Sequence, residues 1–167
     1  RTGLYEEWVN LGLGRSGNGE AGYITYSGYP GEVVIMDGLN LYSWVSAFFS
    51  GGEWAAVNYV AVRNIIIRNY GSAGIVFDRE SNAFRNGSHH ILLENLILHH
   101  NGQEGIIIWE GGTGSNHCTH NIKIRNCETY HNKMHGIKLN GDAASILDRG
   151  HIHDAVIEDC ISHNNGH

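Results

Sequence analysis

The sequence of 167 residues is poor in proline, cysteine and basic side chains, and each shortage limits the structures or partners that the chain can have. Proline occurs once, so tight turns must come from other residues, and 23 glycines and 17 asparagines can supply them. The three cysteines are an odd number, which excludes complete pairing within the chain. No apolar run approaches the roughly 20 residues of a membrane span. The 11 Lys and Arg are scattered and the net charge is −6, which argues against a nucleic-acid partner.

The sequence is rich, by contrast, in internal repetition. Gly74, Gly105 and Gly136 lie 31 residues apart, and isoleucine follows each of them. A second column keeps nearly the same spacing: Asn64, Asn95, Asn126 and Asp159. A period of this length indicates stacked copies of one supersecondary unit. About three and a half copies are visible.

The apolar positions within each repeat are two residues apart, which predicts strands and not helices. One such column is Val62, Leu93, Ile124 and Ile157, and another begins two residues earlier at Val60. A second short strand follows each repeated glycine. Two or more strands in each repeat, joined by an asparagine bend and a glycine turn, predict an all-β, right-handed parallel β-helix with one repeat in each coil.

This pattern resembles the pectate-lyase-like right-handed parallel β-helix proteins from Val57 onward, and more weakly before it. The segments Gly3–Val9, Tyr23–Tyr26 and Pro30–Gly38 look like the opening coils of that group. We therefore expect a single domain over residues 1–167, with opening coils in 1–56 and regular coils in 57–167. Because the last coil is incomplete, we expect a piece of a longer chain, with another chain or a missing segment covering the open coil.

Cysteine and histidine also fall into columns. Cys127 and Cys160 share a column with core positions, and they are expected to be stacked thiols. His89, His120 and His153 form another column, which could bind a metal through ring nitrogens but is better explained as a hydrogen-bonded ladder at a turn. Further ladders of the same kind are expected for the columns that begin at His99 and His100.

The best indication of a site is the position of the long polar loops. They follow Phe77, Ile108 and Leu139 in successive repeats, so they should leave the same edge of the stack. Binding and catalytic groups are often found on such loops. The expected site residues are Lys138, His135 and Glu110 for catalysis, Trp109, Asn140 and Arg79 for substrate binding, and Asp78 and Asp142 as Ca²⁺ ligands.

An aromatic face with a row of polar groups suits an extended polysaccharide. If the sugar is a uronate, β-elimination needs a cation beside the carboxylate, a base for the C5 proton and an acid for the leaving oxygen. Lys138 is then the expected base, with His135 or Arg79 assisting, and Ca²⁺ could bind the carboxylates. Hydrolysis would instead use a carboxylate pair such as Asp78 and Glu110.

The family's known catalytic signatures are incomplete in this chain. The Asn-Thr-Asp, Asp-Asp and Gly-His-Gly segments of polygalacturonases are absent, and so is the arginine motif of pectate lyases. Two classes of function stay open. One is a secreted protein, extracellular or at the cell surface, that binds and cleaves a polysaccharide, with lyase chemistry favoured over hydrolysis. The other is a non-catalytic structural, adhesin or fibre-forming β-helix.

Overall fold

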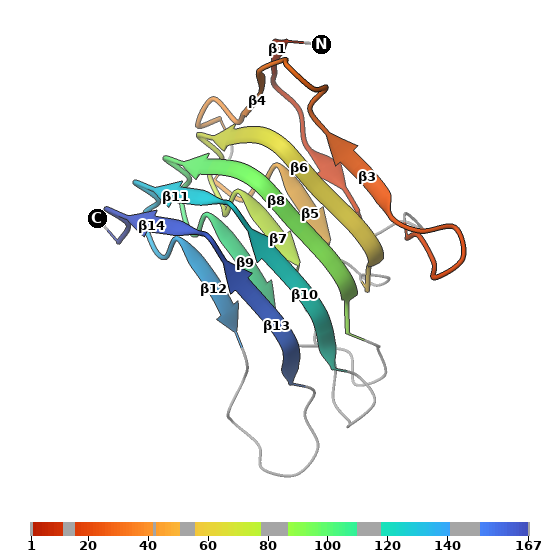
Figure 1. The fold of residues 1–167 in the computed structure, drawn as a ribbon. Coiled ribbons are helices and arrows are strands. Elements are labelled where there is room, and N and C mark those ends of the chain that lie inside the picture. The colour runs from red at the N-terminus through yellow and green to blue at the C-terminus, as the bar shows by residue number, and fades with distance from the viewer. Residues whose placement is uncertain are drawn as a thin grey trace.

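The protein is a parallel β-helix of about four turns, which confirms the fold expected from the repeat. The computed structural model describes residues 2–11, 16–41, 43–50, 56–77, 87–109, 118–140 and 151–166. Figure 1 shows the strands stacked side by side along one axis. No helix occurs among these residues, and accordingly none there has the length and apolarity needed to cross a membrane.

The described residues form fourteen strands, and all but β6 and β8 have seven residues or fewer. They are β1 (Gly3–Tyr5), β2 (Val9–Asn10), β3 (Ile24–Ser27), β4 (Val34–Asp37), β5 (Phe48–Ser50), β6 (Asn58–Arg68), β7 (Ile75–Phe77), β8 (His89–His99), β9 (Ile106–Trp109), β10 (Thr119–Arg125), β11 (Glu128–Tyr130), β12 (Ile137–Asn140), β13 (Ile152–Glu158) and β14 (Ile161–His163). Every pair of neighbouring strands is parallel, as a coil that returns to the same side once per repeat requires.

Two sheets wrap around the core. The nine-stranded sheet follows the order β1-β4-β6-β8-β10-β13, with β3, β11 and β14 paired beside this path. The five-stranded sheet has the order β12-β9-β7-β5-β2. Val62, Leu93 and Ile124 stand opposite one another in the register of β6, β8 and β10, as the repeat predicted. All three are fully buried in one hydrophobic cluster.

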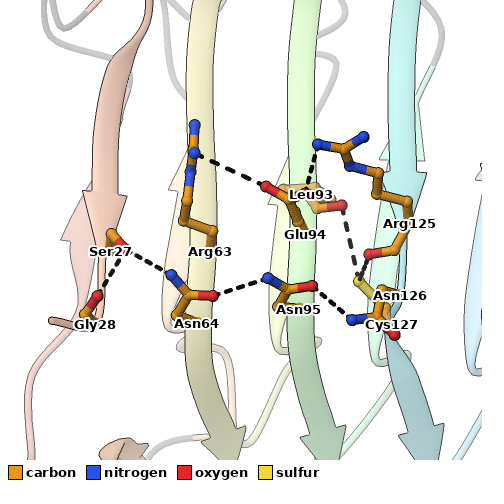
Figure 2. Close-up of polar contacts among 10 residues, drawn as sticks. All are labelled: Ser27, Gly28, Arg63, Asn64, Leu93, Glu94, Asn95, Arg125, Asn126 and Cys127. Atoms are coloured by element: carbon orange, nitrogen blue, oxygen red, sulfur yellow. Dashed lines mark hydrogen bonds and ion pairs between the residues drawn. The ribbon is translucent and has the colours of Figure 1, made fainter. Parts of the chain in front are cut away.

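Asparagine occupies the same bend in three successive coils: within β6, within β8, and between β10 and β11. Asn64, Asn95 and Asn126 have φ values of 59°, 54° and 50°, a left-handed conformation that asparagine tolerates better than most residues. Figure 2 shows their amides joined from coil to coil. Asn95 donates to Asn64 at 2.9 Å and Asn126 donates to Asn95 at 2.6 Å. The expected asparagine ladder is therefore present.

The repeated glycines have a different role from the one expected. Gly74 and Gly105 are not left-handed, since Gly22, Gly31 and Gly166 are the glycines with positive φ in the described part of the chain. A Cβ atom on Gly74 would lie 2.8 Å from the carbonyl oxygen of Gly105 in the next coil. Glycine is needed because neighbouring backbones approach closely, whereas Asn, His and Asp supply most left-handed bends.

A second amide ladder lies inside the stack, and the sequence analysis did not single it out. Asn101 and Asn132 are 1% exposed, and Asn101 donates through Nδ2 to Oδ1 of Asn132 at 2.9 Å. Asn132 donates in the same way to Asn165 at 2.9 Å. The same carbonyls accept backbone N–H groups, including that of Tyr70 on Asn101. The ladder therefore satisfies backbone donors that would otherwise be buried without partners.

The cysteines of the repeat are stacked thiols, as expected. The pairing of Arg125 with Glu158 and of Glu128 with Ile161 places Cys127 opposite Cys160. Both are free, and Cys160 is less buried because it lies in the last coil. Burial raises the pKa of Cys127 to about 12, so its thiol is protonated at neutral pH.

Candidate functional site

A groove crosses the outer face of the five-stranded sheet. Its cavity is about 400 Å³ in volume and is lined by Trp44, Ser46, Phe49, Ser72, Val76, Gln103, Glu104, Ile107, Trp109, Met134 and Lys138. These residues come from four successive coils, those of β5, β7, β9 and β12. Phe49, Val76, Ile107 and Lys138 are direct neighbours across those strands. Three strand spacings, roughly 14 Å in all, separate Phe49 from Lys138.

The floor of this groove is more buried than its sequence suggested. Val76 and Ile107 point away from the main core, but they are only 6% and 4% exposed. They form a second, smaller apolar cluster with Ala73, and the side chains of Phe49 and Trp109 pack against it. The floor is consequently well packed, and the charged groups of the groove, Glu104 and Lys138, stand at one end of it.

The polar end is organised around a buried glutamate. The Glu104 side chain is 3% exposed, and its Oε1 atom lies 3.3 Å from Nδ1 of His135 and 3.7 Å from Nζ of Lys138. His135 is 59% exposed and Lys138 is 29% exposed. A carboxylate held away from water interacts strongly with nearby cations and donors. Glu104 therefore fixes both side chains and leaves their outer surfaces accessible.

Trp109 completes this end of the groove. The Nζ atom of Lys138 lies 5.7 Å from the centre of the Trp109 ring, a cation–π distance. Asn140 pairs with Trp109 in the register of β12 and β9, so it stands beside the same ring on the neighbouring strand. Trp44, at 74% exposure, lines the same groove.

The structure thus brings together half of the residues expected from the sequence. Lys138, His135, Trp109 and Asn140 lie on neighbouring coils, and the first three are linked through Glu104 or through the Trp109 ring. The other four, Asp78, Arg79, Glu110 and Asp142, fall outside the described residues. Asp78 and Asp142 are the expected Ca²⁺ ligands. Most of each long polar loop also lies outside the described residues.

Sequence reasoning missed Glu104 and Trp44. A signal for Glu104 existed, because the position before each repeated glycine reads Ala73, Glu104 and His135. An acid and a histidine one coil apart in a single column predict contact. Trp44 had no comparable signal, since it precedes the regular repeats and no column contains it.

The histidine columns form ladders, as expected, but their rings are joined from coil to coil by stacking where hydrogen bonds had been expected. His89 and His120 have ring centres 4.9 Å apart, and His120 and His153 have theirs 5.1 Å apart. Burial lowers the pKa of His89 and of His120, and neighbouring histidines lower it further. His99 stacks on Tyr130 in a separate column, at 4.7 Å. Imidazole nitrogens lie in the ring plane, so near-parallel stacked rings hold them side by side along the column and do not direct them toward one point. These columns alone therefore make no metal site.

Comparison of the chain with protein-family models, with curated proteins and with solved structures finds no match. The resemblance to pectate-lyase-like proteins accordingly extends to the β-helical architecture and no further. What the groove offers chemically is an aromatic wall, an exposed imidazole, an ammonium group and a buried carboxylate that holds the last two.

Proposed function

We propose that the groove binds an extended polysaccharide and that its polar end cleaves a uronate polymer by β-elimination. The observation that carries this proposal is the contact of Glu104 with both His135 and Lys138 beside an aromatic ring. A long, shallow groove over four coils suits a chain ligand better than a compact one. Aromatic faces such as those of Trp109 and Trp44 can stack on sugar rings.

The ion pair with Glu104 favours roles that differ from those expected from the sequence. Lys138 enters the groove as an ammonium group, so it suits the neutralisation of a uronate carboxylate better than the removal of a proton. His135 has one ring nitrogen against Glu104 and an exposed ring, which is the arrangement of an oriented general base. In this chemistry His135 is the base and Lys138 the cation.

The step balances without an external co-reactant. His135 takes the C5 proton of the uronate, and the electron pair left at C5 forms the C4–C5 double bond. The C4–O bond breaks, and the leaving oxygen takes a proton from a general acid or from water. Ammonium charge at Lys138 stabilises the carboxylate as negative charge develops beside it. Glu110 and Arg79 stay proposed participants, and Asp78 and Asp142 stay proposed Ca²⁺ ligands.

The experiment is a screen of the protein against uronate and neutral glycans. Unsaturated product is followed by absorbance and hydrolysis by reducing ends, with Lys138→Ala, His135→Ala and Glu110→Gln in parallel. Lys133→Ala is the matched control, because Lys133 is an exposed lysine of the same coil that does not line the groove. We expect Lys138→Ala and His135→Ala to abolish unsaturated product and Lys133→Ala to leave it intact.

Binding is measured separately from cleavage. Trp109→Ala should weaken binding of an oligosaccharide, whereas Trp8→Ala should not, since Trp8 is 53% exposed but does not line the groove. Product formation unaffected by any groove variant would place the chemistry elsewhere. No binding to any glycan would overturn the carbohydrate proposal. A location outside the cell or at its surface is proposed with this function.

A structural role is the second candidate, and the last coil supports it. β13 and β14 carry exposed apolar side chains, with Val156 at 47%, Ile157 at 48% and Ile161 at 61% exposure. Open parallel strands can pair with another segment. We propose that another chain or a further segment covers this surface in the functional particle. A monodisperse monomer in light scattering, for the 167 residues alone, would contradict that proposal.

A further inference from the structure

A cysteine and two histidines converge outside the groove, where the chain enters β10 and β13. Cys118 immediately precedes β10, His151 immediately precedes β13, and His153 lies within β13. The Sγ atom of Cys118 is 3.4 Å from Nδ1 and 3.9 Å from Nε2 of His151. One ligand atom from each of the three residues lies within 4.8 Å of the other two.

The register of the coils produces this convergence. Thr119 pairs with Ile152, which places Cys118 opposite His151 on the neighbouring coil. Residues two apart in an extended segment point to the same side, so His153 projects beside His151. The ring centres of these two histidines are 5.1 Å apart. Three donors from two coils thereby meet at one point, unlike the parallel rings of the histidine ladders.

The donor set selects the class of ion. Thiolate and imidazole ligands favour zinc and its first-row neighbours, whereas Ca²⁺ takes oxygen ligands. Zinc–sulfur bonds of about 2.3 Å and zinc–nitrogen bonds of about 2.0 Å place S and N roughly 3.5 Å apart in a tetrahedron. The 3.4 Å separation of Cys118 Sγ and His151 Nδ1 is close to that requirement.

The surroundings of His153 fit the role of a ligand. Its Nδ1 atom lies 2.8 Å from Oδ2 of Asp154, which leaves Nε2 for a metal. A carboxylate in this outer position fixes the ring and raises its basicity. His120 stacks on the His153 ring at an interplanar angle of 8° and limits its rotation.

We propose that Cys118, His151 and His153 bind a divalent transition-metal ion, Zn²⁺ foremost, through one thiolate and two neutral imidazoles. Three protein ligands leave the fourth tetrahedral position to water. The site is independent of the proposed function of the groove, because none of its three ligands lines that cavity.

Cobalt titration of the chelator-treated protein tests the proposal directly. Co²⁺ bound by a thiolate gives a sulfur-to-metal charge-transfer band, and a four-coordinate site gives strong visible bands. We expect both to saturate at one equivalent and to disappear when Zn²⁺ is added. Exposed histidines elsewhere cannot give the sulfur band. Absence of that band in the unaltered chain, at excess Co²⁺, would overturn the proposal.

Variants then assign the ligands. Cys118→Ser should remove the charge-transfer band, and Cys160→Ser is the matched control that should retain it, because Cys160 lies in a different column. His151→Ala or His153→Ala should prevent saturation at one equivalent. Asp154→Asn should keep the band and weaken metal affinity by about 10–100-fold. A band that survives in Cys118→Ser or is lost in Cys160→Ser would contradict the assignment.

A folding defect would not leave the question open. Circular dichroism without metal shows whether Cys118→Ser keeps its strands, and Cys118→Ala offers a second variant. If both unfold, X-ray absorption of the zinc-loaded unaltered chain decides, since one sulfur among the nearest ligands is expected. A coordination shell of nitrogen and oxygen alone would overturn the proposal.

Discussion

Glu104 and His135 lie one coil apart in the same column, with Oε1 of the first 3.3 Å from Nδ1 of the second. The carboxylate is almost wholly buried, while the imidazole is more than half exposed. Burial holds the Glu104 carboxylate in place, and its contact orients the His135 ring. The packed coils thereby determine the orientation of an exposed side chain. Lys138 makes the second contact with the same oxygen, at 3.7 Å.

The first prediction concerns the coupling of Glu104 with Lys138. Lys138→Met should lower the free energy of unfolding by about 1–3 kcal/mol, because it removes a cation from a buried carboxylate. In the double variant with Glu104→Gln, the loss should be smaller than the sum of the two single losses. Urea unfolding of the four proteins measures this. Strictly additive losses would show that the pair is not coupled.

Register in the core is tested at two adjacent leucines of β8. Leu93 is fully buried, so Leu93→Ala should cost about 2–5 kcal/mol of unfolding free energy. Leu92 points away from the core and is only partly buried, so Leu92→Ala should cost clearly less. Chemical denaturation compares the two. Equal losses, or an unchanged melting temperature for Leu93→Ala, would contradict the register.

The two asparagine ladders should differ in what they contribute. Asn132→Ala leaves the backbone N–H and the side-chain amide of Asn101 without their acceptor in a buried site. We expect a loss of about 1–3 kcal/mol for each group left unpaired. Asn126→Gly removes one step of the exposed ladder but keeps a residue that tolerates φ of 50°, so it should cost less. Thermal melts of both variants decide the order.

Acid should destabilise the fold through His99. Burial, assisted by the charges of His100 and Arg68, lowers the pKa of His99 to about 4. The unfolded histidine titrates near 6.5, so the unfolded chain binds a proton between about pH 6.5 and 4 that the folded chain does not. The stability associated with His99 is therefore present above pH 6.5 and lost as the pH falls toward 4.

The measurement is the melting temperature across that window. His99→Tyr keeps an aromatic ring in a column that already contains Tyr130, stacked at 4.7 Å, and removes the titration. We expect its melting temperature to fall less steeply between pH 6.5 and 4 than that of the unaltered chain. His89 and His120 have pKa values lowered in the same direction, so part of the fall should remain. Identical pH profiles would contradict this account.

The fold was predictable because every coil repeats the same physical requirements. An apolar residue at the position of Leu93 and an asparagine at that of Asn95 recur at a fixed spacing, and stacking follows directly from that recurrence. Lys138 could be placed in a groove because its neighbours Ile137 and Leu139 pack against the core. The site was harder to predict, because Glu104 acts through contacts between coils and Trp44 lies outside the repeat.

One consequence of the common register concerns how such a molecule changes length. Excision of residues 89–119, which is 31 residues, would join Ser88 to His120 and place Asn58 opposite the same kind of partner it has now. The bends, ladders and core columns would close over the gap, whereas a deletion within a strand that is not a whole coil would move the later side chains of that strand out of their columns. We therefore expect such a chain to lengthen or shorten by whole coils. Loss of this one coil would remove Glu104 and Trp109 but keep Lys138.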